Sequence, residues 1–148
     1  MRWTPHATVA TIAEHQGRFL LVEELSAEGQ LVINQPAGHL EENESFIEAA
    51  RRETLEETGW HVEPSHFLGL YVYKAPSNGV TYHRACFIAD ALSHDPEREL
   101  DSGIQRALWL TRDEVAARGD RLRSKLVLQC IDDYLAGTRY PLSLIHEP

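Results

Sequence analysis

The sequence predicts one α/β domain that spans residues 1–148. Runs rich in β-branched and aromatic residues, bounded by turn residues, recur along most of the chain and indicate strands. Two further segments carry apolar residues at helical spacing. Strands packed with a few helices give an α/β domain, and 148 residues can bury one substantial core. No repeat or linker indicates a second domain.

Strands dominate the N-terminal part. Residues 6–14 and 19–25 are predicted strands, and Gly17 lies in the turn between them, so we expect the two to form a hairpin. A loop around Gly29 then leads to a short strand at residues 31–34.

A helix is predicted to begin near Ser45 and to end at Gly59. Ser45 and Glu48 have the spacing of a capping box. A glycine such as Gly59 is well suited to the left-handed residue that ends a helix. The apolar side of this helix consists of Phe46, Ala49, Ala50 and Leu55.

The C-terminal half contains three more predicted strands and two more helices. The expected strands are residues 67–73, 81–92 and 107–110. The expected helices are residues 113–117 and 124–135, the second with apolar residues at helical spacing.

Composition restricts the class of partner and the compartment. The net charge is −9 and no run of lysine or arginine is present, which argues against binding of a nucleic acid polymer. Cys86 and Cys130 are too few for a disulfide framework. The chain has no apolar run long enough for a membrane span and no apolar leader at its start. We therefore expect a cytoplasmic protein that does not enter a membrane.

Three carboxylates on the first helix are the strongest functional signal. Residues three and four apart share a helix face, so Glu53, Glu56 and Glu57 are predicted to project together. Such carboxylates repel one another unless a cation lies among them, and Mg²⁺ prefers oxygen ligands. The alternative is a solvated acidic face on which Arg51 and Arg52 form exposed ion pairs.

The segment from Gly38 to Trp60 resembles the signature box of the Nudix hydrolases. Gly38 is followed after five residues by Glu44, and after seven more by Arg52-Glu53-Thr54-Leu55-Glu56-Glu57-Thr58-Gly59-Trp60. Every charged and glycine position matches that pattern. The one departure is Thr54, where the family prefers a large aliphatic residue at a packing position.

This resemblance implies a Nudix α/β/α sandwich with a central mixed sheet, and hydrolysis of a phosphoanhydride that depends on Mg²⁺, for which Mn²⁺ can substitute. It implies that Arg52 orients a glutamate and that Glu44 fixes the geometry of the loop and helix. The implied metal ligands are Glu53, Glu56, Glu57 and the backbone carbonyl of Gly38.

Two residues compete for the role of catalytic base. Glu53 is the first candidate. Nudix enzymes often take the base from a later loop instead, and the best match to that loop is residues 101–104. Its usual acidic position holds Gly103, and Asp101 lies at the wrong offset. This departure favours Glu53 and leaves Asp101 as the alternative.

Several other residues are candidates for contact with the substrate. Each also has an ordinary structural interpretation, as a solvated loop residue, a surface charge or a packing residue. Trp109 can stack on a base, although a Trp in a short apolar strand is more often part of the core. The substrate-binding candidates are His39, Lys74, Arg84, Arg123 and Tyr140.

Segments outside the box narrow the resemblance to one branch of the family. Residues 5–10, 34–41, 122–124 and 137–142 are similar to bacterial Nudix phosphatases that act on hydroxymethylpyrimidine pyrophosphate, thiamine pyrophosphate and nucleoside di- and triphosphates. The implied partner is a small phosphorylated substrate from which orthophosphate is released. The protein itself is expected to be a monomer or a homodimer. Alternatives are a pyrophosphohydrolase that releases a nucleoside monophosphate and pyrophosphate, and a non-catalytic nucleotide-sensing module.

Overall fold

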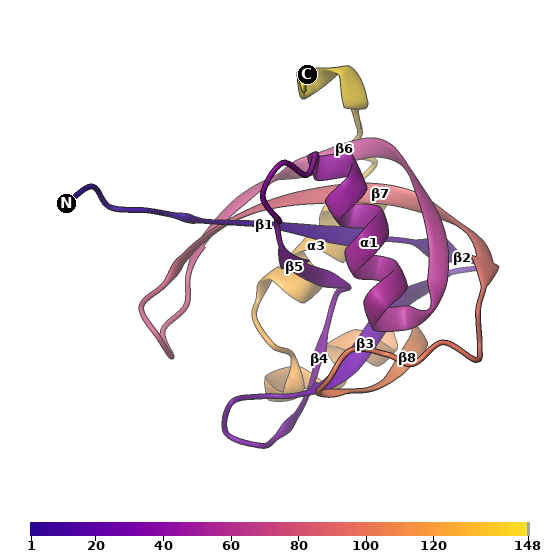
Figure 1. The fold of residues 1–148 in the computed structure, drawn as a ribbon. Coiled ribbons are helices and arrows are strands. Elements are labelled where there is room, and N and C mark those ends of the chain that lie inside the picture. The colour runs from indigo at the N-terminus through magenta and orange to yellow at the C-terminus, as the bar shows by residue number, and fades with distance from the viewer. Residues whose placement is uncertain (148) are drawn as a thin grey trace.

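The computed structural model describes residues 1–147, in which the strands form two sheets (Figure 1). The larger sheet has the strand order β5-β1-β7-β6-β9. β1 runs parallel to β7 and the other pairs are antiparallel, so this central sheet is mixed, as predicted. Its strands are β1 His6–Ile12, β5 Ala37–His39, β6 Trp60–Lys74, β7 Thr81–His94 and β9 Tyr140–Pro141.

The smaller sheet is antiparallel, and its pairing shows that the hairpin expected between residues 6–14 and 19–25 is wrong. β3 lies between β4 and β8, and the turn at Gly17 joins β3 only to a two-residue strand, β2. β1 pairs instead with β5 and β7 in the other sheet. A strand-forming pattern indicates an extended segment but does not identify its partner. The strands are β2 Glu14–His15, β3 Arg18–Leu25, β4 Leu31–Asn34 and β8 Ile104–Thr111.

Helices cover both faces of the mixed sheet, which confirms the predicted layers. Figure 1 shows α1 on one side of β1 and β7 and α3 on the other. The helices are α1 Phe46–Thr58, α2 Arg112–Ala116 and α3 Leu126–Leu135, with short 3₁₀ turns η1 Gly119–Arg121 and η2 Leu142–Leu144. Within residues 1–147, no helix has both the length and the apolar character needed to cross a membrane.

Two apolar clusters hold the layers together, and alternate residues of β1 supply both. Val9 packs with Phe87 of β7 beneath α1, whereas Ala10 and Ile12 pack between the two sheets and α3. This division follows from the alternation of side chains along a strand. Residues of β1 that lie on the same face as Ala10 and Ile12, nearer the N-terminal end of the strand, therefore also point between the two sheets. The same holds for their paired neighbours on β7.

α1 begins and ends where the sequence predicted. The Ser45 hydroxyl accepts a hydrogen bond from the Glu48 backbone N–H at 3.0 Å. Gly59 has φ of 75°, and its N–H donates to the Leu55 carbonyl at 2.9 Å. A side-chain cap contributes about 1 kcal/mol, and glycine adopts a positive φ without a steric penalty. These caps fix the register of the carboxylate-bearing turns.

Thr54, the departure from the family pattern, is fully buried on the inner face of α1. Its hydroxyl oxygen lies 2.9 Å from that of Thr11 on β1 and 2.8 Å from the Ala50 carbonyl. A buried hydroxyl is tolerated when it is hydrogen-bonded. Thr11 therefore provides the polar partner that accommodates threonine at this packing position.

Candidate active site

The segment that contains β5 and leads into α1 lies directly against the helix. Gly38 is paired with Val9 of β1, and a Cβ atom at Gly38 would overlap the Glu53 carboxyl group. A side chain at position 38 would therefore displace the Glu53 carboxyl group from its observed position. The first glycine of the sequence motif therefore brings backbone and carboxylate into contact.

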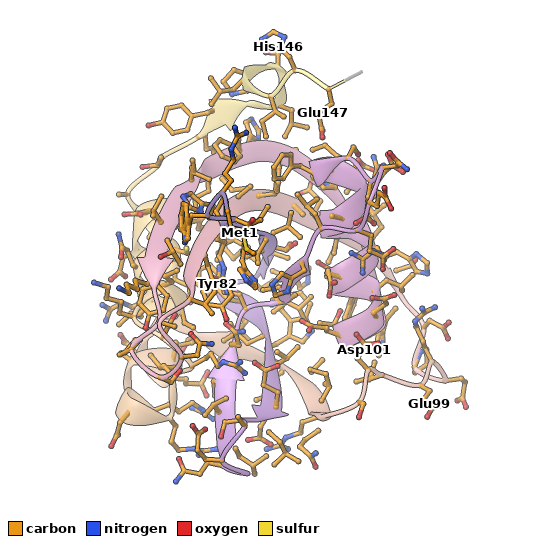
Figure 2. The ribbon with its side chains drawn as sticks, turned by 60° about the vertical axis from the view of Figure 1, so that its left-hand side comes forward. Met1, Tyr82, Glu99, Asp101, His146 and Glu147 are labelled. Atoms are coloured by element: carbon orange, nitrogen blue, oxygen red, sulfur yellow. The ribbon has the colours of Figure 1, made fainter. Side chains whose placement is uncertain are left out.

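Three carboxylates converge beside this loop. Oxygen atoms of Glu53, Glu56 and Asp101 all lie within 4.8 Å of one another. The Asp101 N–H donates to the Glu56 carbonyl at 3.0 Å, which fixes the loop before β8 beside α1 (Figure 2). Burial raises the pKa of the Glu53 carboxyl, and the negative charges of Glu56 and Asp101 raise it further. The group repels added negative charge and favours a cation.

Arg52 connects this cluster to the loop. Its guanidinium donates to both oxygens of Glu44 at 2.6 and 2.9 Å, and to Glu53 and Glu56 at 2.8 and 2.9 Å. It also donates to the His39 carbonyl at 3.0 Å. The Arg52 hydrogen bond lowers the pKa of Glu44. These contacts connect Arg52 to Glu44 and to two carboxylates of the cluster; the orienting role of Arg52 and the supporting role of Glu44 stay predictions.

Glu57 lies apart from the three-carboxylate group. Its side chain accepts a hydrogen bond from the Ala37 N–H at 2.9 Å, so it ties the loop to α1 from the other side. Burial raises the pKa of Glu57 to about 8, with further contributions from Glu24 and Glu53. The structure thus groups Asp101 with Glu53 and Glu56, whereas Glu57 contacts the backbone of Ala37.

The metal-free protein is expected to lose stability as the pH rises from 5 to 9. The folded pKa of Glu57, about 8, exceeds its ordinary value of 4.5, so ionisation disfavours the folded state through this interval. Glu57→Gln keeps an acceptor for Ala37 and removes the titration. Each pKa unit corresponds to about 1.4 kcal/mol, so wild type should lose roughly 2–4 kcal/mol more than the variant. Urea unfolding in EDTA at pH 5, 7 and 9 measures this difference, and parallel pH profiles would contradict it.

The residues of the cluster fit a hard divalent cation. Mg²⁺ and Mn²⁺ prefer carboxylate and carbonyl oxygens, and both kinds are present at Glu53, Glu56, Asp101 and the loop at Gly38. Arg52 supplies one positive charge to several carboxylates, so the negative charge is only partly balanced. These residues can hold such an ion.

A cavity of about 360 Å³ opens on the other side of Gly38. It lies between β1, the β6–β7 hairpin and the start of α3, and three of the predicted substrate-binding residues line it: His39, Arg84 and Arg123. Lys74 and Tyr140 do not line it. Lys74 is an exposed residue at the end of β6, and Tyr140 on β9 pairs with Phe67 and is 47% exposed.

The cavity wall combines aromatic rings with hydrogen-bonding groups. His39 Nε2 lies 3.0 Å from His6 Nδ1, and Tyr82 packs edge-on against both rings. Burial, and then the proximity of His6, lowers the pKa of His39. Arg123 donates to Glu24 at 3.0 Å at the rim. A ligand here would meet both flat apolar surfaces and polar atoms.

Trp109 belongs to a different part of the surface. It is partly buried and packs edge-on against Trp60, with ring centroids 5.4 Å apart. Both residues line a separate cavity of about 480 Å³ at the C-terminal end of α1. Trp109 is therefore not a residue of the cavity beside Gly38.

Sequence reasoning did not predict the positions of three residues in and around the site. Asp101 was considered only as a base, and Thr8 and Gln35 were not considered as parts of the cavity. Thr8 lines the cavity, and Gln35 accepts a hydrogen bond from Arg84 at 3.1 Å. The available sequence signal for Asp101 was its acidic side chain close to Gly103, in the loop where the family often carries a base. No sequence signal indicated that Thr8 would line the cavity.

Comparison with known proteins agrees with this geometry. The family model described as NUDIX domain matches residues 3–130. Phosphatase NudJ of Escherichia coli strain K12 is 40% identical over 141 residues, which are 95% of this chain and 90% of that protein. Phosphatase NudJ of Shigella boydii shows the same identity and coverage.

A solved structure with a similar sequence shares the whole fold. The NUDIX hydrolase from Nitrosomonas europaea is 46% identical and has a TM-score of 0.96, and the aligned region covers 98% of each chain. A UDP-X diphosphatase with a TM-score of 0.74 is 18% identical over 95% of this chain and 68% of its own, so it supports the fold alone. The chain belongs to the Nudix hydrolase family.

Proposed function

We propose that this enzyme is a divalent-metal-dependent phosphatase that removes orthophosphate from the terminal phosphoanhydride of small substrates. The substrates in this proposal are nucleoside di- and triphosphates and the pyrophosphates of hydroxymethylpyrimidine and thiamine. The observation that carries the proposal is the convergence of Glu53, Glu56 and Asp101 beside Gly38, at the edge of a cavity sized for a small molecule. The resemblance to phosphatases NudJ supports the choice of product.

The proposed ligand groups are the carboxylates of Glu53, Glu56 and Asp101, with the Gly38 carbonyl and the carboxylate of Glu57, which contacts the neighbouring Ala37 N–H. Bound Mg²⁺ would lower the pKa of a coordinated water and neutralise charge on the phosphoryl oxygens. The chain's own contribution is to hold these oxygens in place before substrate arrives.

Glu53 is the proposed acceptor of the proton from the attacking water. It lies at the centre of the group, between Glu56 and the Gly38 loop, and Arg52 holds one of its oxygens at 2.8 Å. The second oxygen is therefore the one available to accept a proton. Asp101 is the exposed member of the group and is the alternative acceptor.

The cavity is the proposed place for the organic part of the substrate. His39 and Tyr82 offer flat surfaces against which a heterocycle can pack. Arg123 lies at the rim and remains a proposed contact. Lys74 and Tyr140 are outside the cavity, so in this proposal they contact only substrates that extend beyond it.

Phosphorus NMR of the products tests this function. Orthophosphate is expected from an ADP-, ATP- or thiamine-pyrophosphate-type substrate in the presence of Mg²⁺ or Mn²⁺, and excess EDTA is expected to stop the reaction. The carboxylate group has little other counter-charge, which is the reason for the metal requirement. Pyrophosphate as the main product would indicate a pyrophosphohydrolase instead. Full activity in EDTA would contradict the metal-dependent mechanism.

A further inference from the structure

A second cavity, of about 480 Å³, lies at the C-terminal end of α1 and takes no part in the proposed reaction. It shares no lining residue with the cavity beside Gly38, and none of the proposed metal ligands lines it. Cavities of roughly 300–1,000 Å³ commonly hold a small molecule. Three segments form its walls: the paired ends of β6 and β7, the loop that follows β7, and one face of β8. The cavity is therefore a candidate site separate from the carboxylate cluster.

Two tryptophans from different sheets meet in this second cavity. Trp60 begins β6 and is paired with His94 at the end of β7, whereas Trp109 lies on β8 of the smaller sheet. Gln105, Ala107 and Trp109 alternate along β8, so their side chains project from one face of that strand toward the cavity. The second cavity thus lies where the ends of the two sheets come together.

The aromatic rings in this cavity form a corner. The rings of Trp60 and Trp109 are nearly perpendicular, with an interplanar angle of 87° and centroids 5.4 Å apart. The His94 ring stacks on Trp60 with centroids 4.8 Å apart and an angle of 17°. Both tryptophans are only partly buried. Aromatic rings pair by offset stacking or edge to face, so a flat ring in this corner can stack on one indole and meet the other edge-on.

One cation beside the aromatic corner has no anionic partner. Arg98 lies on the loop after β7 and lines the second cavity. Among residues 1–147, no carboxylate oxygen lies within 4.0 Å of its guanidinium, whereas Arg106, the other lining arginine, pairs with Glu23 at 3.2 Å. Asp95 and Gln105 add a carboxylate and an amide to the wall. The cavity therefore combines flat apolar surfaces, hydrogen-bonding groups and an unpaired positive charge.

The loop that carries Arg98 is fixed to the C-terminal end of α1 at two points. The Asp95 N–H donates to the Gly59 carbonyl at 2.8 Å, and the Asp101 N–H donates to the Glu56 carbonyl at 3.0 Å. Between these points the Arg98 N–H donates to the Asp95 carbonyl at 3.2 Å. A wall that is held in place before binding loses little conformational entropy when a ligand arrives. The arrangement is that of a preformed site.

We propose that this second cavity is a ligand site that takes a nucleoside monophosphate. The heterocycle packs in the corner between Trp60 and Trp109, where Asp95 and Gln105 can hydrogen-bond its polar edge. Arg98 binds the phosphate, because its guanidinium fork matches phosphate oxygens. A cationic ligand would also pack on an indole, but it would meet the unpaired charge of Arg98. This site goes beyond the proposed function, because binding requires neither the metal nor hydrolysis.

The indole N–H signals in an NMR titration of the full chain test this site directly. The chain has three tryptophans, and Trp3, which packs against His83, does not line the second cavity. Replacing each tryptophan in turn by phenylalanine assigns the signals. With uridine monophosphate in EDTA, the Trp60 and Trp109 signals are expected to shift together while the Trp3 signal stays unchanged. Uridine, which lacks the phosphate, should bind about 3–10-fold more weakly. Ribose 5-phosphate, which lacks the ring, should leave both signals in place.

Two arginine variants locate the bound phosphate. Arg98→Gln should weaken the binding of uridine monophosphate about 3–10-fold, because it loses a charge-assisted hydrogen bond at an exposed position. Its midpoint in urea unfolding should equal that of wild type, since an exposed residue without a partner contributes little to stability. Arg123→Gln is the matched control, because it removes an arginine at the rim of the first cavity and should leave the shifts unchanged.

Four results would overturn this proposal. The first is no shift of the Trp60 and Trp109 signals at millimolar uridine monophosphate. The second is equal affinity of wild type and Arg98→Gln for that ligand, or of wild type for uridine and uridine monophosphate. The third is loss of the shifts in Arg123→Gln but not in Arg98→Gln, which would move binding to the first cavity. The fourth is tighter binding of tetramethylammonium than of uridine monophosphate, which would mean that the aromatic corner takes a cation.

Discussion

Replacing Glu53 by glutamine is expected to lower kcat by at least about 10²-fold, the lower range for loss of a general acid–base group. Glutamine keeps the side-chain volume and one hydrogen-bond acceptor for Arg52. In the wild-type protein Arg52 Nη1 lies 2.8 Å from the Glu53 carboxylate. It removes the basic oxygen and one negative charge from the cluster with Glu56 and Asp101. The measurement is orthophosphate release at saturating Mg²⁺.

The same substitution should not destabilise the metal-free protein. Burial and the neighbouring charges raise the pKa of Glu53, so ionisation of this group opposes folding at neutral pH. Urea unfolding in EDTA is therefore expected to give a midpoint equal to or above that of wild type. A lower midpoint would mean that the loss of turnover reports damage to the fold.

Glu48→Gln provides the matched control for Glu53→Gln. Glu48 is an exposed glutamate on the same helix, and its side chain is not part of the carboxylate cluster. Its replacement should change kcat little. Near wild-type turnover by Glu53→Gln would remove Glu53 from the mechanism, and Asp101→Asn would then test the alternative base.

Local sequence signals were sufficient for α1 and the loop that precedes it. The cap residues Ser45 and Gly59 act on their own backbone neighbours, so their spacing determines where the helix begins and ends. The contact between Gly38 and Glu53 follows from the same short segment, because β5 leads directly into α1. Interactions within one segment can be inferred from residue type and spacing.

The different positions of the three glutamates illustrate a limit of helical spacing. At about 100° per residue, Glu56 and Glu57 project to opposite sides of Glu53. Spacing predicts that all three share a broad face, but not what contacts each edge. In the folded chain Asp101 contacts the Glu56 edge and Ala37 contacts the Glu57 edge. Both neighbours are set by tertiary packing.

The proximity of Thr8 and Arg84, two residues that line the cavity, depends on strand pairing. Thr8 and Arg84 are far apart in sequence and become neighbours only because β1 pairs in parallel with β7. The expected hairpin placed β1 beside β3 instead, and with that pairing Thr8 would have had no relation to Arg84. Long-range register is therefore the information that sequence patterns lacked, both for the sheet and for the lining of the cavity.

Replacing Arg52 is expected to reduce both activity and stability, in contrast to Glu53→Gln. Arg52 donates to Glu44, Glu53 and Glu56, and its side chain is 21% exposed. Arg52→Gln leaves these carboxylates facing one another without a counter-charge. Breaking a buried ion pair costs about 3–5 kcal/mol, and partial exposure reduces this to roughly 2–3 kcal/mol. We expect kcat to fall by about 10²-fold, since Glu53 loses its orientation.

Two further variants separate charge from geometry at this position. Arg51→Gln is the control, because Arg51 is an exposed neighbour that pairs with Glu63, and its loss should change stability by less than about 1 kcal/mol. Arg52→Lys keeps the positive charge but cannot reproduce the planar fork that reaches both Glu44 oxygens and Glu53. It should recover most of the stability measured by urea unfolding in EDTA and little of kcat. Recovery of full turnover by lysine would show that Arg52 acts through its charge alone. Turnover by Arg52→Gln within about 3-fold of wild type, well short of the ~10²-fold expected for lost orientation, would exclude the orienting role.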